Sequence, residues 1–142
     1  MSREFNSHVI VGYAIPEKEI EKLSTQNGDE TTYIVAGQEC SCYEEIAHAV
    51  WKFCGEGVSY LTTEGVTLYN GGTGEECSDE IILFCLDFGT EVETYDFVRL
   101  HVSVAELSSD KTKARLIALR EVLHTCGIEV GEAGIYHIEY WS

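Results

Sequence analysis

Five polar residues near the C-terminal end of the sequence have side chains that could bind a small molecule. Three of them alternate with apolar residues over 98–104, and two alternate with their neighbours over 134–141, so each group shares one face of a predicted strand. If the two strands are neighbours, the groups meet in one patch of convergent polar groups. The alternative is an arginine and a glutamate that form a cross-strand ion pair on a solvated face. The five residues are Arg99, His101, Ser103, His137 and Glu139.

Other motifs with chemical potential fit their usual sites poorly. The glycine-rich stretch 70–74 follows a strand, as a phosphate loop does, but two glutamates come next, where a phosphate needs positive charge. Cys40, Cys42 and His48 lack the two close ligand pairs of structural zinc sites. Acids surround Cys42, and no histidine is placed by sequence to act as its base. We therefore predict no catalytic residue, no metal site and no cofactor.

The elements that would position these side chains begin with the strands. The longest apolar run, 81–86, predicts a strand buried on both faces in the middle of a sheet. The alternating stretch 98–104 is expected to form a hairpin with it. The shorter stretches 58–61 and 65–70 are expected to form a second hairpin. The stretch 8–15 is apolar on both sides, which predicts another interior strand.

Three helices are predicted from capping residues and apolar spacing. The first covers 16–25, and the third covers about 108–126 with apolar residues at helical spacing. The second covers 41–54 and is expected to begin with a capping box, in which Ser41 and Glu44 satisfy backbone donors. The apolar side of this second helix is expected to contain Cys42, Tyr43, Ile46, Ala47, Val50, Phe53 and Cys54.

The order of strands and helices predicts an α+β fold. Further strands are expected over 31–36 and 134–141. The predicted architecture is a mixed, mainly antiparallel sheet of about five to seven strands, with two to three helices packed mostly on one face. Two to three helices of modest length can cover one face of such a sheet but hardly both. We therefore expect the other face of the sheet to be polar and aromatic.

The charge of the chain is strongly negative and unevenly placed. The sequence has 25 acidic residues against 9 lysines and arginines, which gives a formal net charge of −16. Residues 1–98 hold 19 acids against 4 bases, a balance of −15, whereas residues 99–142 hold 6 against 5, a balance of −1. Such a field repels nucleic acid and anionic lipid and attracts cationic protein surfaces. We therefore expect a basic protein surface as partner, and no direct contact with nucleic acid or membrane.

The residues expected to bind this partner lie in two parts of the acidic region. One part is the polar side of the second predicted helix, which carries acids and an exposed tryptophan, an uncommon surface residue. The other part is the acidic stretch that precedes the run 81–86. The predicted partner-binding residues are Glu44, Glu45, Trp51, Glu75, Glu76 and Asp79.

Two functional hypotheses follow from these patterns. The leading one is a small acidic, non-catalytic protein-interaction module or inhibitor that binds a basic protein surface. In one version the protein mimics nucleic acid, and its partner is then a nucleic-acid-binding protein. The alternative hypothesis is a small-molecule-binding domain or small enzyme that uses the polar sheet face.

Assembly and location can also be predicted. Tyr140 and Trp141 are large aromatic residues near the C-terminus, and residues 99–142 are nearly neutral, so a homodimer through this part is expected. The chain is expected to form one globular domain over 1–142. The start of the sequence is polar and no apolar run approaches the ~20 residues that cross a bilayer, which predicts a cytoplasmic protein with reduced cysteines.

Overall fold

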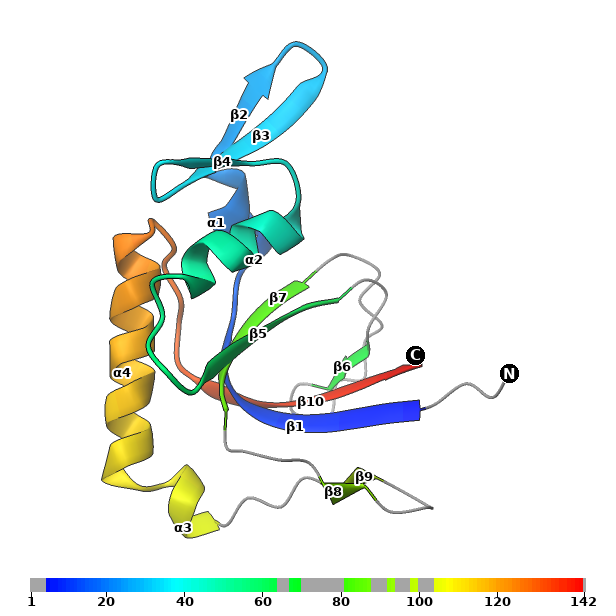
Figure 1. The fold of residues 1–142 in the computed structure, drawn as a ribbon, viewed down its shortest axis with the longest axis vertical. Helices are drawn as coiled ribbons and strands as arrows, with labels where there is room; N and C mark the ends of the chain where they lie inside the picture. The colour runs from blue at the N-terminus through cyan, green and yellow to red at the C-terminus, as the bar shows by residue number, and fades with distance from the viewer. Residues whose placement is uncertain are drawn as a thin grey trace.

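A five-stranded antiparallel sheet forms the body of the protein in the computed structural model (Figure 1). The structure describes residues 5–63, 67–69, 81–87, 92–93, 98–99 and 104–141. The order of the strands is β5-β7-β1-β10-β6, so strands from both ends of the chain lie inside the sheet. Their bounds are β1 Phe5–Ala14, β5 Val58–Thr63, β6 Thr67–Tyr69, β7 Ile81–Leu86 and β10 Gly134–Trp141.

The two ends of the chain pair along their length in this sheet. Strands β1 and β10 are antiparallel, from Phe5 opposite Trp141 to Gly12 opposite Gly134. On its other side β1 meets β7, and there a Cβ on Gly12 would lie 1.9 Å from the Phe84 carbonyl oxygen. Only glycine permits this close approach between the two strands.

A second, three-stranded sheet projects from the body (Figure 1). It consists of β2 Ser24–Asn27, β3 Glu30–Val35 and β4 Gln38–Cys40, in that order. The β3–β4 turn uses Ala36 and Gly37, whose φ angles of 48° and 79° suit a tight two-residue hairpin. Only β3 was expected from the sequence, because β2 and β4 are short and polar.

The first helix is shorter than its sequence pattern predicts. Helix α1 covers Glu17–Glu21, not 16–25, and the Ser24 hydroxyl donates to the Glu21 carbonyl at 2.5 Å just beyond its end. The predicted helix offers little apolar surface to bury after Ile20. The polar residues that follow it instead pair with β3 as strand β2.

The main core lies between one face of the five-stranded sheet and the helices. Helix α2 covers Tyr43–Trp51 and packs on strands of both sheets, and α4 covers Asp110–Thr125. The predicted apolar side of α4 is confirmed by its buried residues, and Ser109 caps it by accepting the Thr112 N–H. The largest fully buried side chains are Phe84, Ile20, Ile46, Ile82, Leu83, Leu123, Ile128, Val35 and Val50.

The apolar side of α2 is partly different from the predicted one. Ile46, Ala47 and Val50 are buried as expected. Cys42 is exposed and Phe53 is 53% exposed, because the helix begins at Tyr43 and ends at Trp51, so neither residue lies within it. A helical wheel extended beyond the true ends of the helix therefore misplaced both.

The opposite face of the five-stranded sheet carries an apolar patch at its centre. Leu83 is fully buried there, packed with Ile10, Ala14, Leu61 and Tyr136. The expectation of a polar face was wrong for this patch. Strand β7 has apolar side chains at every described position, so it brings them to both faces of the sheet.

The α+β class and the mainly antiparallel five-stranded sheet are confirmed, but both predicted hairpins were wrong. Strands β5 and β6 lie at opposite edges of the sheet, and β7 pairs with β5 and β1. Strand β9, Val98–Arg99, pairs with β8, Val92–Glu93, as a separate ribbon, and helix α3 begins at Val104 and ends at Leu107. Alternation predicts a strand but not its partner.

Membrane-spanning helices are not found in the described part of the chain. No helix there is both long and apolar enough to cross a bilayer. The longest, α4, has 16 residues, and many of them are charged.

Candidate functional site

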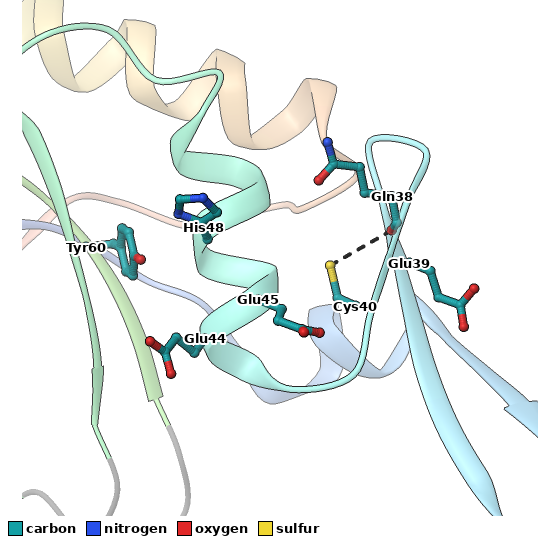
Figure 2. A pocket seen from close by; sticks show the side chains of 7 residues that line it. All are labelled: Gln38, Glu39, Cys40, Glu44, Glu45, His48 and Tyr60. Carbon is teal, nitrogen blue, oxygen red and sulfur yellow. Dashed lines mark hydrogen bonds between the residues drawn. The ribbon is translucent and has the colours of Figure 1, made fainter.

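A groove of about 370 Å³ lies over helix α2, between strand β4 and strand β5 (Figure 2). This volume is typical of pockets that hold small ligands or single side chains of a partner. We call it the α2–β4 groove. The residues that line it are Gln38, Glu39, Cys40, Glu44, Glu45, His48 and Tyr60.

Strand β4 forms one wall of the groove. Figure 2 shows the side chains of Gln38 and Cys40 directed toward α2, whereas the Glu39 carboxylate points away from the helix. Cys40 is buried, and its thiol donates to the Gln38 carbonyl at 3.9 Å. Burial raises the pKa of the Cys40 thiol, with smaller contributions from Glu45 and Cys42. The cysteine is therefore a neutral, apolar part of this wall.

The first turn of α2 supplies the acidic side chains of the groove. Glu45 accepts two hydrogen bonds through one carboxylate oxygen, from the Ser41 N–H at 2.5 Å and the Ser41 hydroxyl at 2.8 Å. These bonds, the backbone one first, hold the pKa of the Glu45 carboxyl below its usual range. Glu45 therefore stays ionised over a wide pH range.

The predicted capping box was wrong by one residue, and this has a consequence for Glu44. The helix begins after Cys42, so Ser41 bonds to Glu45, four positions on, and not to Glu44. Within the described part of the chain, no hydrogen bond or ion pair reaches the Glu44 carboxylate. In Figure 2 this carboxylate extends from α2 on the side of Tyr60. It is an exposed acid that the described residues do not use.

A row of aromatic rings runs from the core to the groove. Tyr60 lies 6.1 Å from the buried Phe84 ring and 6.1 Å from Trp51, and Trp51 stacks on His48 at 6.0 Å. The Trp51 indole N–H donates to the Val58 carbonyl at 3.0 Å, although the residue is 42% exposed. Trp51 is therefore a fixed aromatic surface beside the groove.

The predicted partner-binding residues fall into two groups. Glu44 and Glu45 line the groove, and Trp51 is exposed beside it as the helical pattern predicts. Glu75, Glu76 and Asp79 lie outside the described residues.

Of the predicted ligand-binding residues, Arg99 lies on β9, and His137 and Glu139 lie on β10. His101 and Ser103 lie outside the described residues, and only the backbone of Arg99, His137 and Glu139 is described. Strand β10 pairs with β1 and β6, whereas β9 pairs with β8. In the described part of the chain, no pairing of β9 with β10 brings the two groups together.

Sequence reasoning missed the walls of the groove. Gln38 lies on a three-residue strand, too short to be recognised by alternation, and Tyr60 lies on β5, whose neighbour was predicted wrongly. Alanine rarely adopts the positive φ that such a turn requires, so Ala36-Gly37 is not a clear hairpin signal for β4.

In the described ranges no group of three or more His, Cys, Asp or Glu residues is arranged to hold a metal ion.

The chain was compared with protein-family models, with curated proteins and with solved structures. None of the three comparisons gave a match. Its function must therefore be inferred from the α2–β4 groove and its surroundings.

Proposed function

We propose that this protein is a small acidic, non-catalytic interaction module that binds a basic protein surface through the α2–β4 groove and Trp51. The observation that carries the proposal is the pair Glu44 and Glu45 in a groove bordered by a fixed aromatic row. The net charge of −16 supports the same type of partner. Opposite long-range fields speed the encounter, and local contacts then hold the complex.

The groove suits a lysine or arginine side chain of the partner. Glu45 remains ionised because of its bonds to Ser41. No described residue of the protein binds the Glu44 carboxylate, which is therefore open to a partner's cation. A guanidinium can bind a carboxylate through two parallel hydrogen bonds. The faces of Tyr60 and Trp51 add the negative ring charge that attracts cations.

The aromatic row also has the features of a binding hot spot. Trp51 is held by its hydrogen bond to Val58 and by edge contact with Tyr60, so little side-chain entropy is lost when a partner covers it. Tryptophan is enriched among the residues that contribute most to protein interfaces. Charge and fixed apolar area thus lie next to one another on α2.

Partner capture at two salt concentrations tests this proposal. The bait proteins are the wild type, the double variant Glu44→Gln with Glu45→Gln, and a control double variant, Glu121→Gln with Glu132→Gln. The control removes the same charge from exposed positions outside the groove. We expect a basic protein whose affinity for the groove variant falls at least about tenfold, while the control binds like the wild type.

Salt provides the second criterion. Binding of the captured protein should weaken clearly between 50 mM and 300 mM salt, because the Debye length shortens. The proposal would be contradicted by a partner that binds the groove variant and the wild type with equal affinity, or by one whose affinity is the same at both salt concentrations.

A further inference from the structure

The main chain of Glu39 is directed out of the three-stranded sheet. The two-residue turn makes Val35 and Gln38 a hydrogen-bonded pair, so Ile34 and Glu39, the next pair, do not bond to one another. The Ile34 N–H confirms this parity, because it donates to the Leu23 carbonyl on the β2 side at 2.9 Å. The N–H and C=O of Glu39 therefore both point away from β3.

These two groups lie at the groove. Glu39 lines the groove, yet its carboxylate points away from α2 in Figure 2. Strand β4 is the outer strand of its sheet, and no described strand lies beside it. The outer edge of β4 thus presents one backbone donor and one backbone acceptor at a residue that lines the groove, a few residues before the acids of α2.

We infer that the α2–β4 groove takes an extended peptide segment with basic residues at alternate positions, which adds to β4 as a fourth, antiparallel strand. This inference rests on the proposed function and specifies the form of its partner. Strand addition at a sheet edge obtains affinity from main-chain bonds and specificity from alternate side chains.

The alternation follows from the pleat of the strand. The peptide residue opposite Glu39 makes both main-chain bonds, and its own side chain lies on the outer face with that of Glu39. Its two neighbours then share the face of Gln38 and Cys40, whose side chains are directed toward α2. A lysine or arginine at each neighbouring position is thereby placed on the side of Glu44 and Glu45.

The other edge of the small sheet is less suited to such a peptide. Strand β2 is exposed along its whole length, but its four residues are uncharged. Strand β4 combines an outward-directed main chain with a groove and two carboxylates. Charge complementarity therefore selects β4.

Three synthetic peptides separate strand addition from general attraction of positive charge. The first has the core Arg-Val-Arg between threonines, the second is its isomer Arg-Arg-Val, and the third is the first with an N-methyl group on valine. Calorimetric titration should give about tenfold tighter binding for the first than for the other two. Equal binding of all three would overturn strand addition. If that equal binding still weakened in the Glu44→Gln, Glu45→Gln variant, the proposed function would survive.

Two variants of Glu39 test the protein side. Proline at 39 removes the N–H and is tolerated in edge strands, whereas Glu39→Gln changes only a carboxylate that points away from α2. We expect Glu39→Pro to bind the first peptide about tenfold more weakly than Glu39→Gln, which loses the same carboxylate but keeps the N–H. In case the proline variant unfolds, amide exchange in the wild type gives an independent result. Bound peptide should slow exchange at the Glu39 amide, and unchanged exchange there would contradict the inference.

Discussion

The five-stranded and the three-stranded sheets of this protein use the same backbone pairing for opposite purposes. In β7 of the larger sheet, Ile82 and Phe84 are fully buried, whereas all four residues of β2 in the smaller sheet are exposed. The larger sheet excludes water on both faces at its centre. The smaller one keeps its outer edges open. Stability and binding are therefore expected to reside in different sheets.

Polar groups show the same contrast. In the body, the Tyr13 hydroxyl donates to the Leu116 carbonyl at 3.0 Å, and Arg115 donates to the Gly57 carbonyl, so both tie α4 to the rest of the fold. At the groove, the Glu44 carboxylate and the main chain of Glu39 face outward. Groups that the fold does not use are the ones left for a partner.

The largest expected effect compares one buried and one exposed apolar residue. Phe84→Ala should lower the free energy of unfolding by about 3–5 kcal/mol, since the ring is fully buried. Ile34→Ala, in β3 where the side chain is 44% exposed, should lower it by less than about 1 kcal/mol. Urea denaturation measures both. Similar losses in the two variants would show that the small sheet shares the stability of the body.

A smaller effect compares two glycines with positive φ. Gly28, in the β2–β3 turn, has φ +67° and open space around it, so Gly28→Ala should cost about 1–2 kcal/mol of left-handed strain. Gly57, in the body, has φ +78°, and a Cβ there would lie 2.3 Å from the Arg115 guanidinium. Gly57→Ala should cost about 1 kcal/mol more, because this guanidinium must leave the Gly57 carbonyl.

A double-mutant cycle checks the cause of that difference. When Arg115→Ala is already present, Gly57→Ala should cost no more than Gly28→Ala. An extra cost that persists without the arginine would place the strain in the backbone alone.

The smallest effect on stability near neutral pH concerns the thiols, and it grows only at alkaline pH. Burial raises the pKa of Cys85 in the body and of Cys54 after α2 from 9.0 to about 11. At pH 8 both should be alkylated at least about 100-fold more slowly than in the urea-unfolded chain, because the thiolate reacts. Among the five described cysteines, exposed Cys42, beside the groove, should be modified first. Peptide mass spectrometry after timed labelling distinguishes the cysteines.

The same shifts set a direction for stability. Between about pH 9 and 11 the unfolded chain releases protons from these thiols while the folded protein keeps them, so the free energy of unfolding falls as pH rises. Below pH 8 the thiols are protonated in both the folded and the unfolded state, so they do not make the free energy of unfolding depend on pH. If the free energy of unfolding of the wild-type protein stayed constant up to pH 11, the raised pKa values would be contradicted.

The parts of the fold that could be predicted are those with a local physical signal. The apolar run of β7, the Ser109 cap and apolar stripe of α4, and the strand β10 were all recognised from sequence, since each depends on neighbours within a few residues. Strand β4 and the partners of β5 and β9 were not. Their pairing depends on contacts across the chain that alternation does not specify.

The sequence by itself determined the acidity, the α+β class and the presence of Glu44, Glu45 and Trp51 on the exposed side of one helix. Only the tertiary structure decided that Glu45 bonds to Ser41, that Glu44 is left without a described partner, and that Glu39, whose main chain points away from β3, lines the same groove. The physical reason is that charge and periodicity are properties of single segments. A groove is made by segments that meet only when the chain has folded.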